Sequence, residues 1–128
     1  MWVFQMSSHP PKILVWNVRG LNSSARRSAV YQVVVAANAS IVCLQETKME
    51  DISNDVFRQC LGNKFGNFYY APMTGTRGGI LIAWDSSVVS LSNRYTTANT
   101  LTTLVSQEGV PHWWLTGVYG PQSDADKV

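Results

Sequence analysis

Two apolar segments near the N-terminus, separated by a helical pattern, constrain the fold more than any other feature of the sequence. Residues 12–18 and 40–46 are continuous apolar runs that end in polar residues, which is typical of strands buried on both faces. Between them, apolar residues recur at helical spacing over residues 25–37, and Ser23 or Ser24 can cap that helix. A strand, a helix and a second strand in this order predict two parallel neighbours with a right-handed crossover.

The rest of the chain changes character. A second, short helix is predicted over residues 51–61, and short strands joined by tight turns follow it at residues 67–72, 79–84, 88–95, 99–107 and 112–119. These strands predict an antiparallel meander. Residues 1–11 are expected to be an irregular lead-in, and residues 12–128 one domain. We therefore predict an α/β (α+β) fold, with a mixed sheet and helices on one side.

Composition excludes several classes of protein. The chain has 128 residues, the length of one domain, and 45% of them are apolar, so it can bury a core. No apolar run reaches the roughly 18 residues of a membrane helix, and residues 1–6 do not resemble a signal peptide. Cys43 and Cys60 lie in apolar segments, which predicts reduced, buried thiols of an intracellular protein. The net charge of +2 permits contact with phosphate without arguing for it.

Three polar residues stand where predicted strands end: Asn17, Glu46 and Tyr119. Loops at strand ends build the sites of α/β folds, and adjacent parallel strands would bring Asn17 and Glu46 to the same edge. A carboxylate beside an amide is a usable site for a hard cation such as Mg²⁺. Each residue also has an ordinary interpretation: a solvated loop carboxylate, a turn-forming asparagine and a packing tyrosine.

Four blocks of sequence together carry a resemblance. The blocks are Trp16-Asn17-Val18-Arg19-Gly20-Leu21, Leu44-Gln45-Glu46-Thr47-Lys48, Gly78-Gly79-Ile80 and Val118-Tyr119-Gly120-Pro121. In chain order they resemble the endonuclease/exonuclease/phosphatase superfamily, the fold of the apurinic endonucleases and deoxyribonuclease I. The first block looks most like the endonuclease domain of plant non-LTR (LINE-type) retrotransposons. The resemblance implies the N-terminal portion of a four-layer α/β/β/α sandwich, and a nuclear or cytoplasmic location would follow from it alone.

The resemblance also implies roles for three residues. Glu46 would match the metal-binding glutamate of the family, and Asn17 the asparagine that orients the metal site and the scissile phosphate. Tyr119 would match a tyrosine whose hydroxyl contacts that phosphate. The implied activity is that of a divalent-metal-dependent phosphodiesterase, with Mg²⁺ or Mn²⁺ as cofactor, which cleaves the backbone of nucleic acids. DNA is the implied partner, and no membrane is implied.

The sequence departs from the family pattern at two places. Some apurinic endonucleases carry an aspartate at the position of Arg19. The retrotransposon branch, like this sequence, carries an arginine there. The chain also ends at Val128, before the later Gly-Asp-Phe-Asn-like block and the C-terminal Asp-His pair, and neither His9 nor His112 is expected to replace them. We therefore expect a truncated domain that binds metal weakly or not at all and is inactive alone. We also expect an uncovered inner sheet face that favours self-association.

A non-catalytic role is the alternative. The chain could be a remnant that binds nucleic acid or protein through the first sheet of the fold. Candidate phosphate-facing residues near the strand ends are Arg19, Arg26, Arg27, Lys48 and Arg77. The other interpretation of these cations is scattered solubilising charge, and both remain open at this point.

Overall fold

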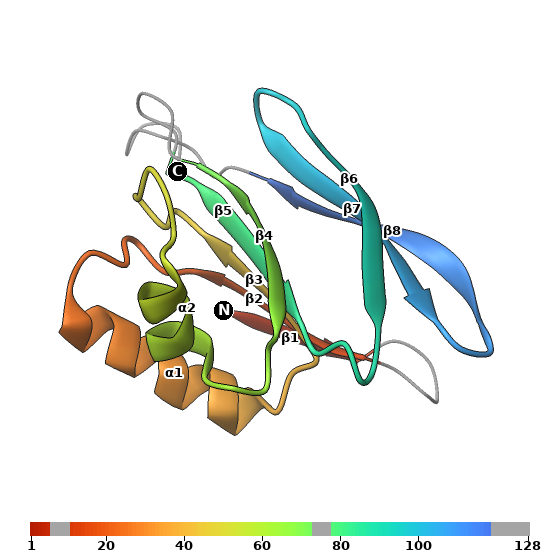
Figure 1. Ribbon diagram of the computed structural model, residues 1–128, viewed down its shortest axis with the longest axis horizontal. Coiled ribbons are helices and arrows are strands. Elements are labelled where there is room, and N and C mark those ends of the chain that lie inside the picture. Colours follow the sequence, from red (N-terminus) through yellow and green to blue (C-terminus); the bar gives the residue numbers. More distant parts are fainter. Residues whose placement is uncertain (6–10, 73–77, 119–128) are drawn as a thin grey trace.

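The computed structural model describes residues 1–5, 11–72 and 78–118. Two helices, a five-stranded sheet and a three-stranded sheet are stacked as three layers, with the helices on one side (Figure 1). The predicted α/β class is confirmed. The elements in chain order are β1 (Trp2–Gln5), β2 (Lys12–Asn17), α1 (Ser24–Ala37), β3 (Ile41–Gln45), α2 (Asn54–Leu61), β4 (Asn67–Ala71), β5 (Ile80–Trp84), β6 (Ser90–Thr96), β7 (Thr100–Gln107) and β8 (Val110–Val118).

The predicted strand–helix–strand unit is present. β2 and β3 pair in parallel, from Ile13 opposite Ile41 to Asn17 opposite Gln45, and α1 connects them. Ser23 caps α1, because its side chain accepts a hydrogen bond from the backbone N–H of Arg26. This cap and the parallel register together fix where β2 and β3 end.

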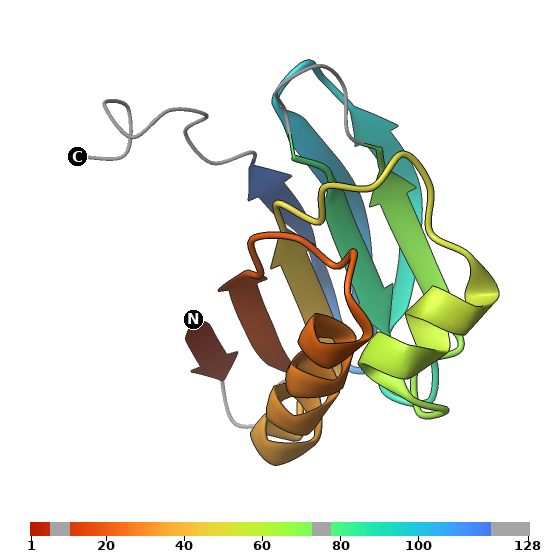
Figure 2. The same cartoon turned by 90° about the vertical axis from the view of Figure 1, so that its left-hand side faces the viewer.

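The first sheet has the strand order β1-β2-β3-β5-β4, in which only β2 and β3 are parallel neighbours. Both helices cover one face of this sheet (Figure 2). The cluster beneath them consists of large side chains from the sheet and from both helices. Its members include Leu14, Val42, Leu44 and Leu81 of the sheet, Val30 and Val34 of α1, and Phe57 and Leu61 of α2.

The second sheet corrects two expectations. β6, β7 and β8 form the predicted antiparallel meander, but as a separate sheet rather than as part of one mixed sheet. This sheet covers the inner face of the first, where Ile41 and Ile82 pack in one cluster with Leu101 and Val105. The second sheet therefore covers the inner face. The exposed surface from which self-association was expected is not present at this face. The physical reason is that Leu101 and Val105 of β7 bury apolar surface against the inner face of the first sheet.

The lead-in prediction is wrong for residues 2–5. These residues form β1, which pairs antiparallel with β2 from Trp2 opposite Val15 to Gln5 opposite Lys12. The edge of β2 offers a row of backbone hydrogen-bonding groups, and β1 satisfies them without needing a strong sequence pattern. No helix in the described part of the chain combines the length and apolar character needed to cross a bilayer.

Both cysteines are free and buried, as predicted. Burial raises the pKa of the Cys43 thiol to about 12. Burial also raises the pKa of Cys60 to about 11, although the nearby charge of Arg27 lowers it in part. Both thiols are therefore protonated at neutral pH and act as small apolar side chains.

We predict that Gly117→Ala destabilises the contact between the two sheets. A Cβ atom at this position would lie 3.0 Å from Cγ2 of Ile80 and 3.1 Å from Sγ of Cys43, on the first sheet. Such overpacking costs about 1–3 kcal/mol in the free energy of unfolding, which urea denaturation measures. Gly66→Ala is the matched control, because a Cβ atom added there would meet no atom within 4 Å. Equal stability of the two variants would contradict the face-to-face packing.

Candidate functional site at the ends of β2 and β3

The parallel strands bring two of the predicted site residues together. Asn17 is the last residue of β2, and Glu46 directly follows Gln45, which lies opposite Asn17 in β3. The carboxyl ends of β2, β3 and β4 point to the same edge of the sheet (Figure 2). Nδ2 of Asn17 donates a hydrogen bond to Oε2 of Glu46, and Oδ1 of Asn17 accepts one from the backbone N–H of Arg19 at 3.2 Å. Asn17 is thus clamped in one orientation, with its amide on the carboxylate.

The backbone around this pair adopts uncommon conformations. Arg19, Glu46 and Lys48 have φ angles of 54°, 55° and 58°, in the left-handed region that side-chain-bearing residues rarely adopt. Backbone hydrogen bonds between the two turns hold them there: Gly20 N–H donates to the Glu46 carbonyl at 2.7 Å, and Leu21 N–H to the Thr47 carbonyl at 3.0 Å. Strain of this kind persists only where neighbouring structure over-determines it, and it concentrates at functional sites.

Glu46 lies in a cradle that only a glycine can form. The residue is 6% exposed, although carboxylates are rarely buried to this extent. A Cβ atom on Gly78 would lie 2.8 Å from Cα and 2.9 Å from Cγ of Glu46. The Gly78-Gly79 block therefore allows the turn before β5 to pass directly against the carboxylate-bearing residue.

Thr47 and Tyr70 hold the turn that follows β3 through side-chain hydrogen bonds. Oγ1 of Thr47 lies 2.8 Å from the hydroxyl of Tyr70, and that hydroxyl donates a hydrogen bond to the Met49 carbonyl. Thr47 is fully buried. Neither residue was predicted in this role from the sequence. Strand alternation places the Tyr70 side chain on the helix side of β4, but no pattern in the sequence identifies its partner across the sheet.

Tyr119, the third predicted site residue, lies outside the described residues. Its chain neighbour Val118 ends β8 and accepts a hydrogen bond from Nε2 of Gln45 at 2.9 Å. This bond joins the end of β8 to the end of β3, beside Glu46. His9 also lies outside the described residues, and His112 is exposed on β8, as expected.

The candidate basic residues divide into two kinds. Arg27 has a structural role, because it joins α1 to α2 and to the preceding turn. Its guanidinium donates hydrogen bonds to Oε1 of Gln59 on α2 at 2.5 Å and to the Leu21 carbonyl at 2.8 Å. Arg19, Arg26 and Lys48 are exposed, and Arg77 lies outside the described residues.

The arrangement offers one buried carboxylate clamped by an amide at a sheet edge. Within residues 1–5, 11–72 and 78–118, no group of three or more His, Cys, Asp or Glu side chains is placed to hold a metal ion. The geometry therefore fits an ion that takes one carboxylate from the protein and its other ligands from water and phosphate, as Mg²⁺ does. It does not fit a closed structural site of the zinc type.

Comparison with known proteins identifies the class. The sequence profile of the Endonuclease/Exonuclease/phosphatase family matches residues 14–121. This range holds both strands of the parallel pair, the Gly78 cradle and the second sheet. The chain belongs to this family, and its fold is the nuclease- and phosphodiesterase-like fold of that family. No curated protein matches the sequence.

Solved structures share the fold at low sequence identity. An AP endonuclease from Leishmania major superposes with a TM-score of 0.60 at 21% identity, over 85% of this chain and 40% of that one. TDP2 from D. rerio, solved with a single-strand DNA product, superposes with a TM-score of 0.59 at 22% identity, over 81% of this chain and 43% of that one. The chain thus spans about two fifths of the length of these structures.

We predict that Gly78→Ala displaces Glu46. The added methyl group would overlap the Glu46 backbone and side chain, and the left-handed turn leaves little room to yield. The free energy of unfolding should fall by about 1–3 kcal/mol, and the side-chain amide resonance of Asn17 should shift in a ¹⁵N NMR spectrum. Gly66→Ala is again the control. An unchanged Asn17 resonance in the Gly78 variant would contradict the close approach.

Proposed function

We propose that the chain carries the metal- and phosphate-binding part of a divalent-metal-dependent phosphodiesterase that cleaves the backbone of nucleic acids. The observation that carries the proposal is the buried Glu46 carboxylate clamped by Asn17 where two parallel strands end. Burying a carboxylate is costly, and strained turns concentrate at functional sites, so this placement of Glu46 supports a functional role. Nucleases of this family generally use divalent metal ions, and the donor chemistry of Glu46 fits Mg²⁺ or Mn²⁺.

Each site residue then has a role. Glu46 would be the protein ligand of the ion, and Asn17 would hold the carboxylate in place and face the scissile phosphate with its amide. When bound, the ion would neutralise charge on the phosphoryl oxygens. Tyr119 would contact the same phosphate through its hydroxyl. The Gln45–Val118 hydrogen bond supports this role, because it anchors the residue before Tyr119 beside the end of β3.

The proposal also covers the substrate and the lineage. DNA is the proposed partner, supported by two structures of similar fold, an AP endonuclease and a TDP2 that holds a single-strand DNA product. The block Trp16–Leu21 supports descent from the endonuclease domains of plant LINE-type retrotransposons. Because the described residues offer one carboxylate and no larger ligand cluster, we propose that these 128 residues bind the ion weakly and do not cleave DNA by themselves.

We predict that Mg²⁺ strengthens DNA binding through Glu46. Fluorescence anisotropy of a labelled oligothymidylate would be measured with and without Mg²⁺ at constant ionic strength. The ion should raise the affinity of the wild-type protein by about 3- to 10-fold, because an ion held by Glu46 also contacts a phosphate oxygen. Glu46→Gln, which is nearly isosteric and keeps a side chain that Asn17 can bond, should abolish the increase. The same increase in both proteins would contradict the proposed role of Glu46.

A plasmid-nicking assay tests the proposed inactivity. The purified chain and Glu46→Ala would be incubated with supercoiled DNA and Mg²⁺. We expect no nicking by the wild-type chain above the level of the variant, because groups that act as a unit lose nearly all activity when some are missing. Metal-dependent nicking that disappears in Glu46→Ala would show instead that the chain assembles a working site. DNA binding that Mg²⁺ does not strengthen, together with an absence of nicking, would favour the non-catalytic binding module.

A further inference from the structure

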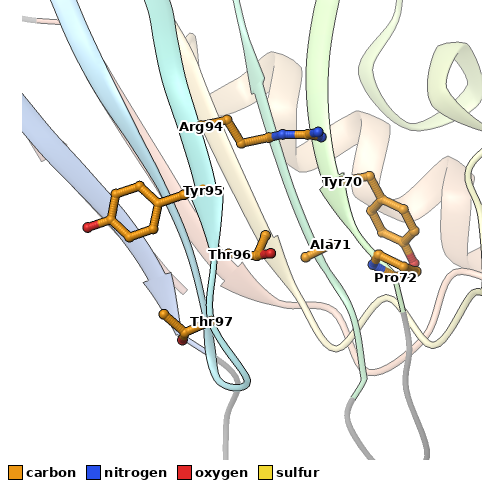
Figure 3. Close-up of a pocket in the computed structure, with 7 residues that line it drawn as sticks. All are labelled: Tyr70, Ala71, Pro72, Arg94, Tyr95, Thr96 and Thr97. Carbon is orange, nitrogen blue, oxygen red and sulfur yellow. The ribbon is translucent and has the colours of Figure 1, made fainter.

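A groove of about 410 Å³ lies between the two sheets (Figure 3), and neither Asn17 nor Glu46 is among the described residues that line it. One wall is the end of β4, the edge strand of the first sheet, with Ala71 and Pro72. The other wall is the end of β6, the edge strand of the second sheet, with Arg94 and Thr96. None of the described residues that line the two walls is a carboxylate. The groove belongs to none of the blocks that defined the candidate site.

Arg94 is held at this groove by an aromatic ring. Its guanidinium carbon lies 5.3 Å from the centroid of the Tyr69 ring, and the side chain extends from β6 across the groove towards β4 (Figure 3). The Tyr69 hydroxyl donates a hydrogen bond to the Leu91 carbonyl at 3.1 Å, and its ring packs on Trp84 at 4.8 Å. The cation is therefore positioned by a fixed ring. Stacking leaves the edge of a guanidinium available for hydrogen bonds.

Within the described residues, the contact of the Arg94 guanidinium is with an aromatic ring, whereas the Arg27 guanidinium is used in hydrogen bonds. Arg27 uses its guanidinium for Gln59 and the Leu21 carbonyl. Arg94 is exposed, and the contact that positions it is the ring of Tyr69. A preorganised guanidinium with remaining donors is the group that proteins use for phosphate.

The groove opens on the same edge as Glu46. In the first sheet, Ala71 lies opposite Ile80, which in turn lies opposite Gln45, so Ala71 is two strands, or about 10 Å, from the residue before Glu46. In the second sheet, Thr96 lies opposite Leu101, next to the pair that joins Thr100 to Val118. Val118 is itself bonded to Gln45. The groove and Glu46 are therefore near enough for one nucleic-acid strand to reach both.

We infer that the groove between β4 and β6 is a binding subsite for a phosphodiester of a nucleic-acid strand, with Arg94 as its anion-binding residue. The Thr96 hydroxyl adds a donor at the same place. The inference rests on the proposed function for the identity of the strand, since a phosphate bound at Glu46 sets the direction in which the next phosphates run. The contact between Arg94 and the phosphate does not require the metal ion.

The test is DNA binding in EDTA, where Glu46 holds no ion. Anisotropy titrations would use a fluorescein-labelled oligothymidylate of eight nucleotides over a series of salt concentrations. Arg94→Gln should weaken binding by about 3- to 10-fold at low salt and lower the slope of log K against log salt by about 0.7, the loss of one phosphate contact on a single strand. Arg94→Lys should restore the slope, because it keeps the charge. Arg58→Gln, which removes an exposed arginine from α2, should change neither quantity.

The outcomes separate this inference from the proposed function. Equal losses in the Arg94 and Arg58 variants, or no binding of the oligonucleotide by the wild-type protein at low salt, would overturn the subsite. If the Arg94 effect is present but the Mg²⁺ effect of Glu46 is absent, the subsite stands and the metal site fails. If the Mg²⁺ effect is present without an Arg94 effect, the metal site stands and the subsite fails. Thermal unfolding of each variant verifies that it is folded, and because Arg94 is exposed we expect the glutamine variant to keep the wild-type fold.

Discussion

The parallel pairing of β2 with β3 is the constraint on which the rest of the structure depends. It is the one parallel contact in the first sheet, and α1 makes the connection that parallel neighbours require. Its register puts Asn17 opposite Gln45, so the next residue, Glu46, meets the Asn17 amide. A shift by one residue would turn Asn17 to the other face and separate the pair. The chemistry of the site is thus set by strand register before any loop is considered.

The two-sheet packing extends this edge into a larger surface. β8 packs closely on the inner face of the first sheet. A side chain at Gly117 would crowd Ile80 and Cys43. Its end is then tied to Gln45. The same stacking brings the edges of β4 and β6 together around Arg94. The Asn17–Glu46 pair, the end of β8 and the Arg94 groove therefore share one edge of the structure, although their residues are spread over most of the chain.

Much of the fold could be predicted from the sequence because its signals are local. Continuous apolar runs marked β2 and β3, and Ser23 followed by apolar residues at helical spacing marked α1. The split of the strands into two sheets could not be predicted, because alternation specifies which face of a strand is buried and not which element buries it. β1 was missed for a similar reason, because an edge strand forms through hydrogen bonds with its neighbouring strand and needs no strong pattern of its own. At the site, position predicted the pairing of Asn17 with Glu46, whereas the Gly78 cradle, the Thr47–Tyr70 contact and Arg94 depend on approaches between distant segments.

The measurement that tests the central claim most directly is paramagnetic broadening by Mn²⁺ in a ¹H–¹⁵N NMR spectrum. The claim is that the clamped Glu46 carboxylate binds a divalent ion. Small additions of Mn²⁺ should selectively broaden the backbone amides of residues 17–20, 46–48 and 78–79 in the wild-type protein, because these surround the carboxylate. The Glu46→Gln variant should keep those resonances sharp at the same Mn²⁺ concentration. Broadening that is unchanged in the variant, or that centres on the surface acids Asp51 and Asp55, would contradict the claim.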